Sequence, residues 1–390
     1  MKIVVTAERS ADETRVAISP ITVQKYIGLG FEVAIEKGAG LKADFTDQAY
    51  IDAGASIDTS LKKLLDKADI LLSVLRPSKD ELKHLPDNAL VIAMLDPYVG
   101  EKELSDLKNS GKTSFAMELM PRISRAQSMD VLSSQSNLAG YKSVLEAAAE
   151  FGRAFPMMMT AAGTIAPARV FIMGVGVAGL QAIATARRLG AIVTATDVRM
   201  ATKEQVESLG AEFVMVEPDA DADNETSGGY AKEMSEDYKK RQAELVATHI
   251  KKQDIVITTA LIPGRPAPEL VSEAMVNSMK QGSVIVDLAT FRGGNCPLSV
   301  KDKVIVHEGV KIIGYSNLAG RLAQDASNLY ARNLLTFVTS LLNEDKTALE
   351  VKWDDEIITG TLLTKNGALV HEFYAAKDVA ETDKEGKDDE

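Results

Sequence analysis

The segment from residue 169 to residue 197 constrains the fold of this chain more than any other. It begins with an apolar, strand-like run, Arg169–Met173, and continues with the spacing G-x-G-x-x-G at Gly174, Gly176 and Gly179. The first glycine allows a tight turn, the second lets the backbone approach a pyrophosphate, and the third lets helix and strand pack closely. The free N–H groups at the start of the helix then face the phosphates. The pattern predicts the βαβ unit of a dinucleotide-binding domain.

An acid follows where such a unit places one. A second apolar run, Ala191–Thr196, ends at Asp197, which lies 23 positions after Gly174. Asp197 is placed to accept hydrogen bonds from ribose hydroxyls, and its charge repels a 2′-phosphate, so NAD is favoured over NADP. Arg199 stands two positions further on and could instead meet a phosphate.

Length, charge and cysteine content narrow the possibilities. The 390 residues exceed what one hydrophobic core usually spans, so we expect two domains. The net charge of −12 argues against nucleic acid or an anionic membrane as a direct partner. Cys296 is the only cysteine, which fits a reducing compartment, and the four histidines have no metal-ligand spacing. We expect no metal site, no signal peptide and no bilayer-spanning segment.

Short apolar runs alternate with helical stretches along the chain, which predicts an α/β fold with parallel sheets. The strands expected in the first half are Lys2–Ala7, Phe31–Glu36, Ile70–Leu75, Ala89–Leu95 and Thr113–Met117. The strands expected in the second half are Arg169–Met173, Ala191–Thr196, Asp254–Thr259, Ser283–Leu288 and Lys311–Gly314. We therefore expect two doubly wound, Rossmann-like domains, of which only the second carries a glycine fingerprint.

Two long helices, Val131–Phe151 and Asp325–Leu342, are expected to join the halves and leave a cleft between them. This organisation assigns residues 1–132 and 322–390 to a first, discontinuous domain and residues 133–321 to the NAD-binding domain. Near the C-terminus the expected short strands are Leu349–Lys352, Ile357–Leu363 and Ala368–His371, with a hairpin turn at Asn366-Gly367.

A polar segment precedes the first of these long helices. Between Met117 and Asn137 it carries Arg122, Arg125, Gln127, Asp130, Ser133 and Ser134. On one interpretation Asp or Ser caps the helix and the arginines are only solvated. On the other, the segment holds the nicotinamide end of a dinucleotide: an arginine binds the carboxamide, an aspartate holds a ribose hydroxyl, and a glutamine bridges to a second ligand.

Two further segments allow two interpretations each. Glu217–Lys240 is acidic and contains Gly228-Gly229-Tyr230, so it is either a solvated insertion or a lid whose tyrosine closes over a cofactor. Met157-Met158-Met159 is either a soft surface for a partner or, as we expect, part of core or interdomain packing.

Several stretches are specific enough for comparison with known families. They include MELMPRISRAQSMDVLSSQSNLAGY, GVGVAGLQAIATA, ATDVR, GGYAKEM, TTALIPG and GGNCPLS. They resemble the NAD(H)-binding component of the Re/Si-specific, proton-translocating NAD(P) transhydrogenases, from Arg15 to about residue 340. The resemblance implies NAD(H) on this chain, NADP(H) on a partner component, and direct hydride transfer that a membrane-spanning component couples to proton translocation. It also implies a homodimer on the cytoplasmic or matrix-equivalent side, peripheral to the inner membrane and active only with its partners.

The resemblance also implies roles for individual residues. Arg122, Gln127, Asp130 and Ser133 would form the catalytic loop at the nicotinamide, with Gln127 facing the NADP side. Tyr230 would be the lid tyrosine. The implied cofactor-binding set is Gly174, Val175, Gly176, Val177, Ala178, Gly179, Asp197, Val198, Arg199, Tyr230, Thr259, Ala260 and Leu261.

Alanine dehydrogenase shares this fold and is the first alternative. That enzyme moves protons with lysine, histidine and aspartate side chains, whereas the corresponding positions here hold Ser73, Leu75, Asp96 and Phe291. Hydride exchange between two nicotinamides moves no proton at the reacting carbons and needs only close, aligned rings. The role of the Thr290-Phe291-Arg292 stretch stays open. A non-catalytic NAD-binding protein is the second alternative, and it would have no reason for the polar loop of residues 122–133.

Overall fold

The computed structural model describes residues 1–216 and 236–372, which form two compact units. Unit 1 comprises Met1–Gln135 together with the chain from Gly320 onward, and unit 2 comprises Ser136–Ala319. Each unit contains its own sheet, flanked by helices, so each buries a hydrophobic core of its own.

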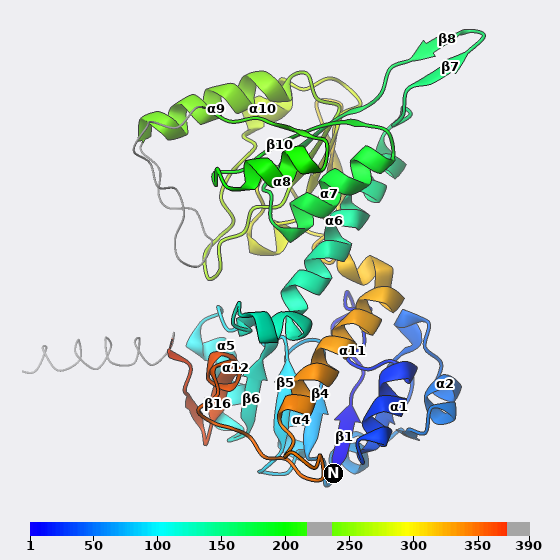
Figure 1. Cartoon of the computed structure of the whole chain (residues 1–390), viewed down its shortest axis with the longest axis vertical. Coiled ribbons are helices and arrows are strands. Elements are labelled where there is room, and N and C mark those ends of the chain that lie inside the picture. Colours follow the sequence, from blue (N-terminus) through cyan, green and yellow to red (C-terminus); the bar gives the residue numbers. More distant parts are fainter. Residues whose placement is uncertain (217–235, 373–390) are drawn as a thin grey trace, which may run out of the picture. The chain divides into compact units, whose positions relative to one another are not determined.

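Unit 1 contains an eight-stranded sheet in the order β17-β16-β6-β5-β4-β1-β2-β3 (Figure 1). Its strands are β1 (Lys2–Val5), β2 (Glu32–Glu36), β3 (Ser56–Asp58), β4 (Ile70–Leu72), β5 (Leu90–Ala93), β6 (Thr113–Ala116), β16 (Leu362–Lys365) and β17 (Ala368–Leu369). Strands β1 to β6 pair in parallel, while β16 and β17 extend the sheet in antiparallel fashion. The strand order reverses between β1 and β4, as in a doubly wound fold.

The α-helices of unit 1 are α1 (Pro20–Gly28), α2 (Asp47–Asp52), α3 (Leu61–Leu65), α4 (Lys79–His84), α5 (Glu101–Asn109), α11 (Ala323–Ser340) and α12 (Glu356–Thr361). Its 3₁₀ turns include η2 (Met117–Leu119) and η3 (Ser124–Met129). Helix α11 buries Tyr330, Leu334 and Phe337 on one face, and the Phe337 ring lies edge-on to Phe115 of β6. This face of the helix therefore forms part of the hydrophobic core of unit 1.

Unit 2 contains a seven-stranded sheet in the order β11-β10-β9-β12-β13-β15-β14. Its strands are β9 (Arg169–Met173), β10 (Ile192–Thr196), β11 (Glu212–Phe213), β12 (Ile255–Thr258), β13 (Val284–Asp287), β14 (Val304–His307) and β15 (Val310–Ile313). All pair in parallel except β14, which is antiparallel to β15. The helices are α6 (Val131–Glu150), whose first residues belong to unit 1, α7 (Val177–Arg188), α8 (Thr202–Ser208), α9 (Glu236–Ile250) and α10 (Glu273–Asn277).

The predicted α/β class with parallel-dominated sheets is confirmed, but two C-terminal strand predictions are wrong. Residues 349–352 form no strand, and Glu356–Thr361 is helix α12. The side chain of Asp355 accepts a hydrogen bond from the Ile357 N–H and so caps this helix. Only the chain from Leu362 onward pairs as a strand. Apolar periodicity over so short a run does not separate helix from strand, and the cap favours the helix.

A hairpin of β7 (Met158–Thr160) and β8 (Gly163–Ile165) has no counterpart among the predicted elements. It extends away from the rest of unit 2 (Figure 1). Met157, Met158 and Met159 are 60%, 40% and 79% exposed, so the expectation that they pack in a core is wrong. In the described part of the chain, no helix combines the length and apolarity needed to cross a bilayer.

Candidate functional site

The glycine turn after β9 is tight at its ends and open in its middle. Gly174 has φ +100°, and its carbonyl oxygen accepts a hydrogen bond from the Thr259 hydroxyl at 2.9 Å. A Cβ atom at Gly179 would overlap that same carbonyl oxygen, whereas a Cβ at Gly176 would have nothing within 4 Å. The first and third glycines are therefore required by the fold, and the second leaves free space beside the backbone.

The N-terminus of α7 lies directly behind this free space. Gly176 is its N-cap residue, and no side chain caps the helix. Gly176 and Val177 are exposed, so the first-turn N–H groups are accessible to a ligand. An uncapped, accessible helix start next to a bare backbone provides what a pyrophosphate requires.

Asp197 directly follows β10, and its carboxylate accepts four hydrogen bonds. Oδ2 accepts the Val175 N–H at 2.7 Å and Arg199 Nη2 at 2.9 Å, while Oδ1 accepts the backbone N–H and Nε of Arg199, both at 2.9 Å. Burial opposes ionisation, but these hydrogen bonds, led by those from Arg199, outweigh it and hold the pKa of Asp197 below its usual value. Val198, between the two, is 44% exposed.

The loop after β12 carries Thr259, Ala260 and Leu261, and a buried asparagine fixes it. The Asn295 side chain accepts the Ala260 N–H at 3.1 Å and donates to the carbonyl oxygens of Ala260 and Pro268 at 2.9 and 2.8 Å. Leu261 is 40% exposed. Sequence reasoning missed Asn295, since a lone asparagine in a glycine-containing loop carries no recognisable spacing.

Asp287, at the end of β13, holds Asn295 in turn. Its buried carboxylate accepts N–H groups of Ala289, Asn295 and Cys296 and the hydroxyl of Ser299. The sequence did offer a signal for Asp287, because it is an acid at the end of the apolar run Val284–Asp287. Polar residues at the carboxyl ends of parallel strands commonly belong to a binding site. Asp287 thus organises a loop that supports the β12 loop.

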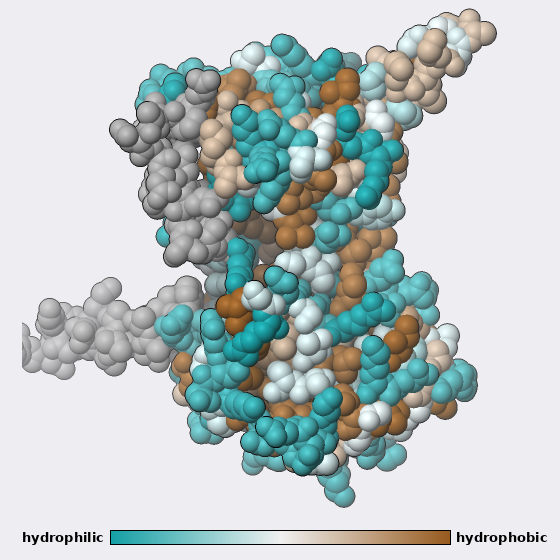
Figure 2. Space-filling model, viewed as in Figure 1, coloured by the Kyte–Doolittle hydropathy of each residue, from teal (hydrophilic) through white to brown (hydrophobic). Residues whose placement is uncertain are grey.

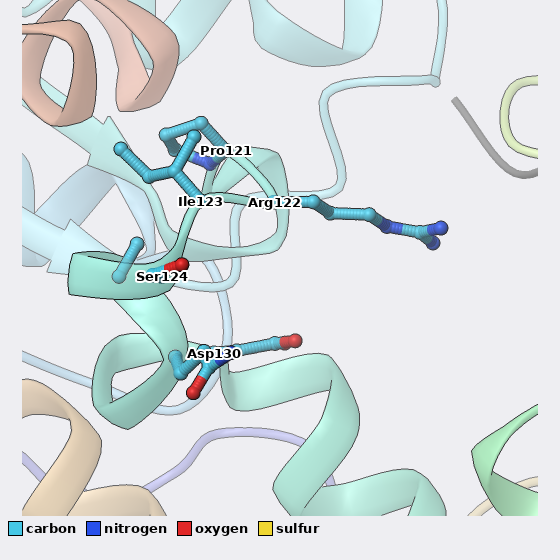
Figure 3. Close-up of a pocket in the computed structure, with 7 residues that line it drawn as sticks. Pro121, Arg122, Ile123, Ser124 and Asp130 are labelled. Carbon is cyan, nitrogen blue, oxygen red and sulfur yellow. The ribbon is translucent and has the colours of Figure 1, made fainter. Parts of the chain in front are cut away.

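The polar segment before α6 surrounds a pocket of about 200 Å³ in unit 1. Its lining residues are Pro121, Arg122, Ile123, Ser124, Ala126, Gln127 and Asp130 (Figure 3). Figure 3 shows the Arg122 side chain extending away from Pro121 and Ile123, with Asp130 on the neighbouring turn at the start of α6. The structure therefore brings three of the four predicted catalytic residues to one pocket, whose volume suits a fragment of a dinucleotide better than the whole molecule.

Ser133 joins this group through Asp130. The Asp130 carboxylate accepts the Ser133 N–H at 2.9 Å and the Ser133 hydroxyl at 2.5 Å, so it also caps the first turn of α6. The capping role and a ligand role can coexist, because a carboxylate has about four acceptor positions and the cap uses two of them.

Two contacts from other elements of unit 1 position this loop. Arg125 forms a two-pronged ion pair with Asp355, both contacts at 2.8 Å, and this pairing lowers the pKa of Asp355. The side-chain amide of Asn333 in α11 donates to the Ser128 carbonyl at 2.8 Å, and its oxygen accepts a hydrogen bond from the Ser134 hydroxyl at 2.8 Å. Sequence reasoning missed both Asp355 and Asn333, because their partners lie about 200 residues away in the chain.

Ser73 and Phe291 lie at two of the positions where the sequence lacks the acid–base groups expected of an alanine dehydrogenase. The buried hydroxyl of Ser73 donates to the Leu75 carbonyl at 2.8 Å, and Phe291 is 48% exposed. A different acid lies against this turn: Glu8 accepts the N–H groups of Val74 and Leu75, and burial raises its pKa to about 7. No group of three His, Cys, Asp or Glu side chains within residues 1–216 and 236–372 is arranged to hold a metal ion. Tyr230 lies outside the described residues.

Comparison with known proteins agrees with this geometry. Residues 4–139 match the family model described as alanine dehydrogenase/PNT, N-terminal domain, and residues 143–372 match its C-terminal domain. The chain is 55% identical over 376 residues to the first part of NAD(P) transhydrogenase subunit alpha from Rhodospirillum rubrum, covering 95% of this chain and 98% of that protein.

Solved structures of transhydrogenase and alanine dehydrogenase are also similar to this chain. The transhydrogenase from Sinorhizobium meliloti is 52% identical, with a TM-score of 0.86 over 95% of this chain and 100% of that one. An L-alanine dehydrogenase is 25% identical, with a TM-score of 0.80 over 98% and 99%. The chain thus belongs to the alanine dehydrogenase/PNT family, and its high-identity relatives are NAD(P) transhydrogenase alpha subunits.

Proposed function

We propose that this chain is the NAD(H)-binding subunit of a proton-translocating NAD(P) transhydrogenase. A partner component would hold NADP(H), and a membrane-spanning component would couple hydride transfer to proton translocation. The observation that carries the proposal is a complete dinucleotide turn in a chain whose proton-transfer positions hold Ser73, Leu75, Asp96 and Phe291. A hydride exchange between nicotinamides needs a dinucleotide-binding turn, and it does not need proton-transfer groups at those four positions.

The pyrophosphate of NAD(H) would bind at the uncapped start of α7, over Gly176. Asp197 would accept the adenosine ribose hydroxyls, and the loop fixed by Asn295 would line the nicotinamide side. The proposed binding residues are Gly174, Val175, Gly176, Val177, Ala178, Gly179, Asp197, Val198, Arg199, Thr259, Ala260 and Leu261, with Tyr230 as a lid.

The nicotinamide ring supplies the hydride chemistry, and the chain supplies position. Arg122 would bind the carboxamide, Asp130 and Ser133 would hold the ribose, and Gln127 would contact the NADP(H) held by the partner. The hydride carries both electrons from one C4 to the other, so no general acid or base is required. Proximity and alignment at about 3–3.5 Å account for such catalysis.

The test is hydride transfer from NADPH to an NAD analogue of distinct absorbance, with the chain alone and with a purified NADP(H)-binding component. We expect rapid exchange only in the mixture. The variant Gln127→Asn should bind NADH normally and exchange at least tenfold more slowly, because a shorter side chain shifts the second ring. Ser124→Ala, at the same pocket but without a proposed ligand contact, is the control.

Alanine dehydrogenase-like activity is the rival supported by the shared fold. Alanine-dependent NAD reduction by the chain alone would support that rival, and tight NADH binding without exchange in the mixture would support a non-catalytic role.

We further propose a homodimer in which the β7–β8 hairpin contacts the second copy. Among the described residues, each hairpin strand pairs only with the other, and no charged residue lies between Arg153 and Arg169. Figure 2 shows the hairpin mostly in tan, and an apolar, uncharged projection of this kind is typical of an interface. A dimer bound peripherally to the inner membrane through its partner subunits follows from the resemblance.

The combined substitution Met157→Ser and Met159→Ser should shift the dimer toward monomer in sedimentation at micromolar concentration. Val306→Ser removes another exposed apolar side chain of unit 2, 67% exposed, and should leave the dimer intact. A hairpin variant that stays dimeric would show that the interface lies elsewhere.

A further inference from the structure

The hydrogen bonds around Asp197 raise a problem for ribose binding. A carboxylate has about four acceptor positions in all. All four are filled: Oδ1 by the backbone N–H and Nε of Arg199, and Oδ2 by the Val175 N–H and Arg199 Nη2. A ribose diol would add two more donors to a carboxylate that already accepts four, so we expect a present donor to leave when the ribose binds.

Only two of the four donors can leave without moving the backbone. The N–H groups of Val175 and Arg199 belong to the glycine turn and to the loop before α8. The Arg199 carbonyl oxygen also accepts the hydroxyl and N–H of Thr202, at 2.8 and 3.2 Å, which fixes the loop from its other side. The Arg199 side chain is 24% exposed, whereas that of Asp197 is 7% exposed. The guanidinium is therefore the more accessible partner of this pair and the one that can move while the carboxylate stays in place.

The two side-chain donors of Arg199 are divided between the carboxylate oxygens, one on each. A vicinal ribose diol presents two O–H donors and binds an acid in the same divided manner. We propose that the Arg199 guanidinium occupies the positions of the adenosine ribose diol in the empty protein and must withdraw before NAD(H) binds. Arg199 is then a built-in competitor that weakens NAD(H) affinity and slows association. The inference rests on the proposed function and reverses the attractive role expected for Arg199.

Competition by Arg199 would lower the affinity for NAD(H) through the adenosine ribose diol. The cost of binding includes breaking two charge-assisted hydrogen bonds, each stronger than a neutral one. Removing the guanidinium donors should raise the affinity for any ligand whose diol takes their place on Asp197. The gain in affinity should be smaller for a ligand that lacks one of the two hydroxyls. A residue that instead contacts the adenine or the pyrophosphate would have the opposite effect on affinity when removed.

The experiment compares Arg199→Met with the wild-type full-length chain. Methionine keeps the length and packing of the side chain but has no donors. We expect NADH to bind about tenfold more tightly to Arg199→Met, mainly through faster association in stopped-flow fluorescence. The gain should be clearly smaller for NADH that lacks the adenosine 2′-hydroxyl. Arg188→Met, an exposed arginine at the far end of α7, is the matched control and should change neither value.

Arg199→Lys provides a second variant that retains the charge. An ammonium group cannot reproduce the two-pronged contact, so this variant should show a smaller gain of the same sign. Weaker or unchanged NADH binding by both variants would overturn the inference, as would an equal gain for the two ligands. Absence of NADH binding to the wild-type chain would overturn the proposed function itself, and is distinguishable because it appears without any substitution.

Discussion

Gly176 and Gly179 lie three residues apart in one turn, yet a side chain would meet opposite surroundings at the two positions. At Gly179 a methyl group would overlap the Gly174 carbonyl oxygen, so strand β9 and helix α7 would have to separate. At Gly176 the same methyl group would enter open space, and φ there is an ordinary −80°. One glycine is thus required for folding, and the other is free for a ligand.

We predict that Gly179→Ala lowers the free energy of unfolding by about 2 kcal/mol, the usual scale of overpacking. Gly176→Ala should leave unfolding within about 0.5 kcal/mol of wild type but weaken NADH binding at least tenfold, because its Cβ would stand against the pyrophosphate. Urea unfolding and calorimetric titration separate the two effects. Undiminished NADH affinity in Gly176→Ala would place the phosphates elsewhere.

At the scale of elements, the loop after β12 depends on a side chain from the loop after β13. We predict that Asn295→Leu raises the Kd for NADH about tenfold, because the backbone of Ala260 loses both of its fixed partners. Some loss of thermal stability should accompany this change, since Asn295 is fully buried. Asn277→Leu, at an exposed asparagine, is the control for the substitution itself. Normal NADH affinity in a folded Asn295→Leu protein would remove the β12 loop from the site.

The elements also show how far sequence alone could go. The βαβ unit around Gly174 was predictable because its glycines and Asp197 act within 30 residues of one another. The hairpin at Met158 was not, because its apolar side chains suggest burial while its strands pair with each other and lie exposed. Helix α12 was mistaken for a strand because its periodicity is short and its cap is a single aspartate.

The candidate site also contains features that the sequence could indicate and features that it could not. Arg122, Gln127, Asp130 and Ser133 could be proposed from resemblance because they lie within one short stretch of sequence, and the first three line one pocket. The ion pair of Arg125 with Asp355 and the fourfold contact of Asp197 were not, because geometry between side chains leaves no trace in a single sequence.

At the scale of the whole molecule, two carboxyl groups of unit 1 should control stability against pH. Burial raises the pKa of Glu8 and of Glu118 from 4.5 to about 7. Between these values the folded chain holds protons that the unfolded chain has already released, so stability falls as pH rises from about 4.5 to about 7 and then levels off. Burial lowers the pKa of His249, so this residue makes the stability rise with pH over the same range. Its effect is the smaller one, because two carboxyl groups act in the opposite direction.

We predict a net loss on the order of 4 kcal/mol in the free energy of unfolding between about pH 5 and pH 7.5. Urea titrations at half-unit intervals measure it. In Glu118→Gln the slope should be about half as steep, whatever the absolute stability of that variant. A free energy of unfolding that rises through this window would show that the two carboxyl groups ionise at ordinary pH in the folded protein.

The central claim is direct hydride transfer across two proteins, and an isotope label tests it most directly. NADPH carrying deuterium at the transferred C4 position would be mixed with this chain, an NAD analogue and the NADP(H)-binding component in ordinary water. The account predicts deuterium on C4 of the reduced analogue, none lost to solvent, and no transfer when either protein is omitted. Loss of the label to water, or transfer by this chain alone, would contradict it.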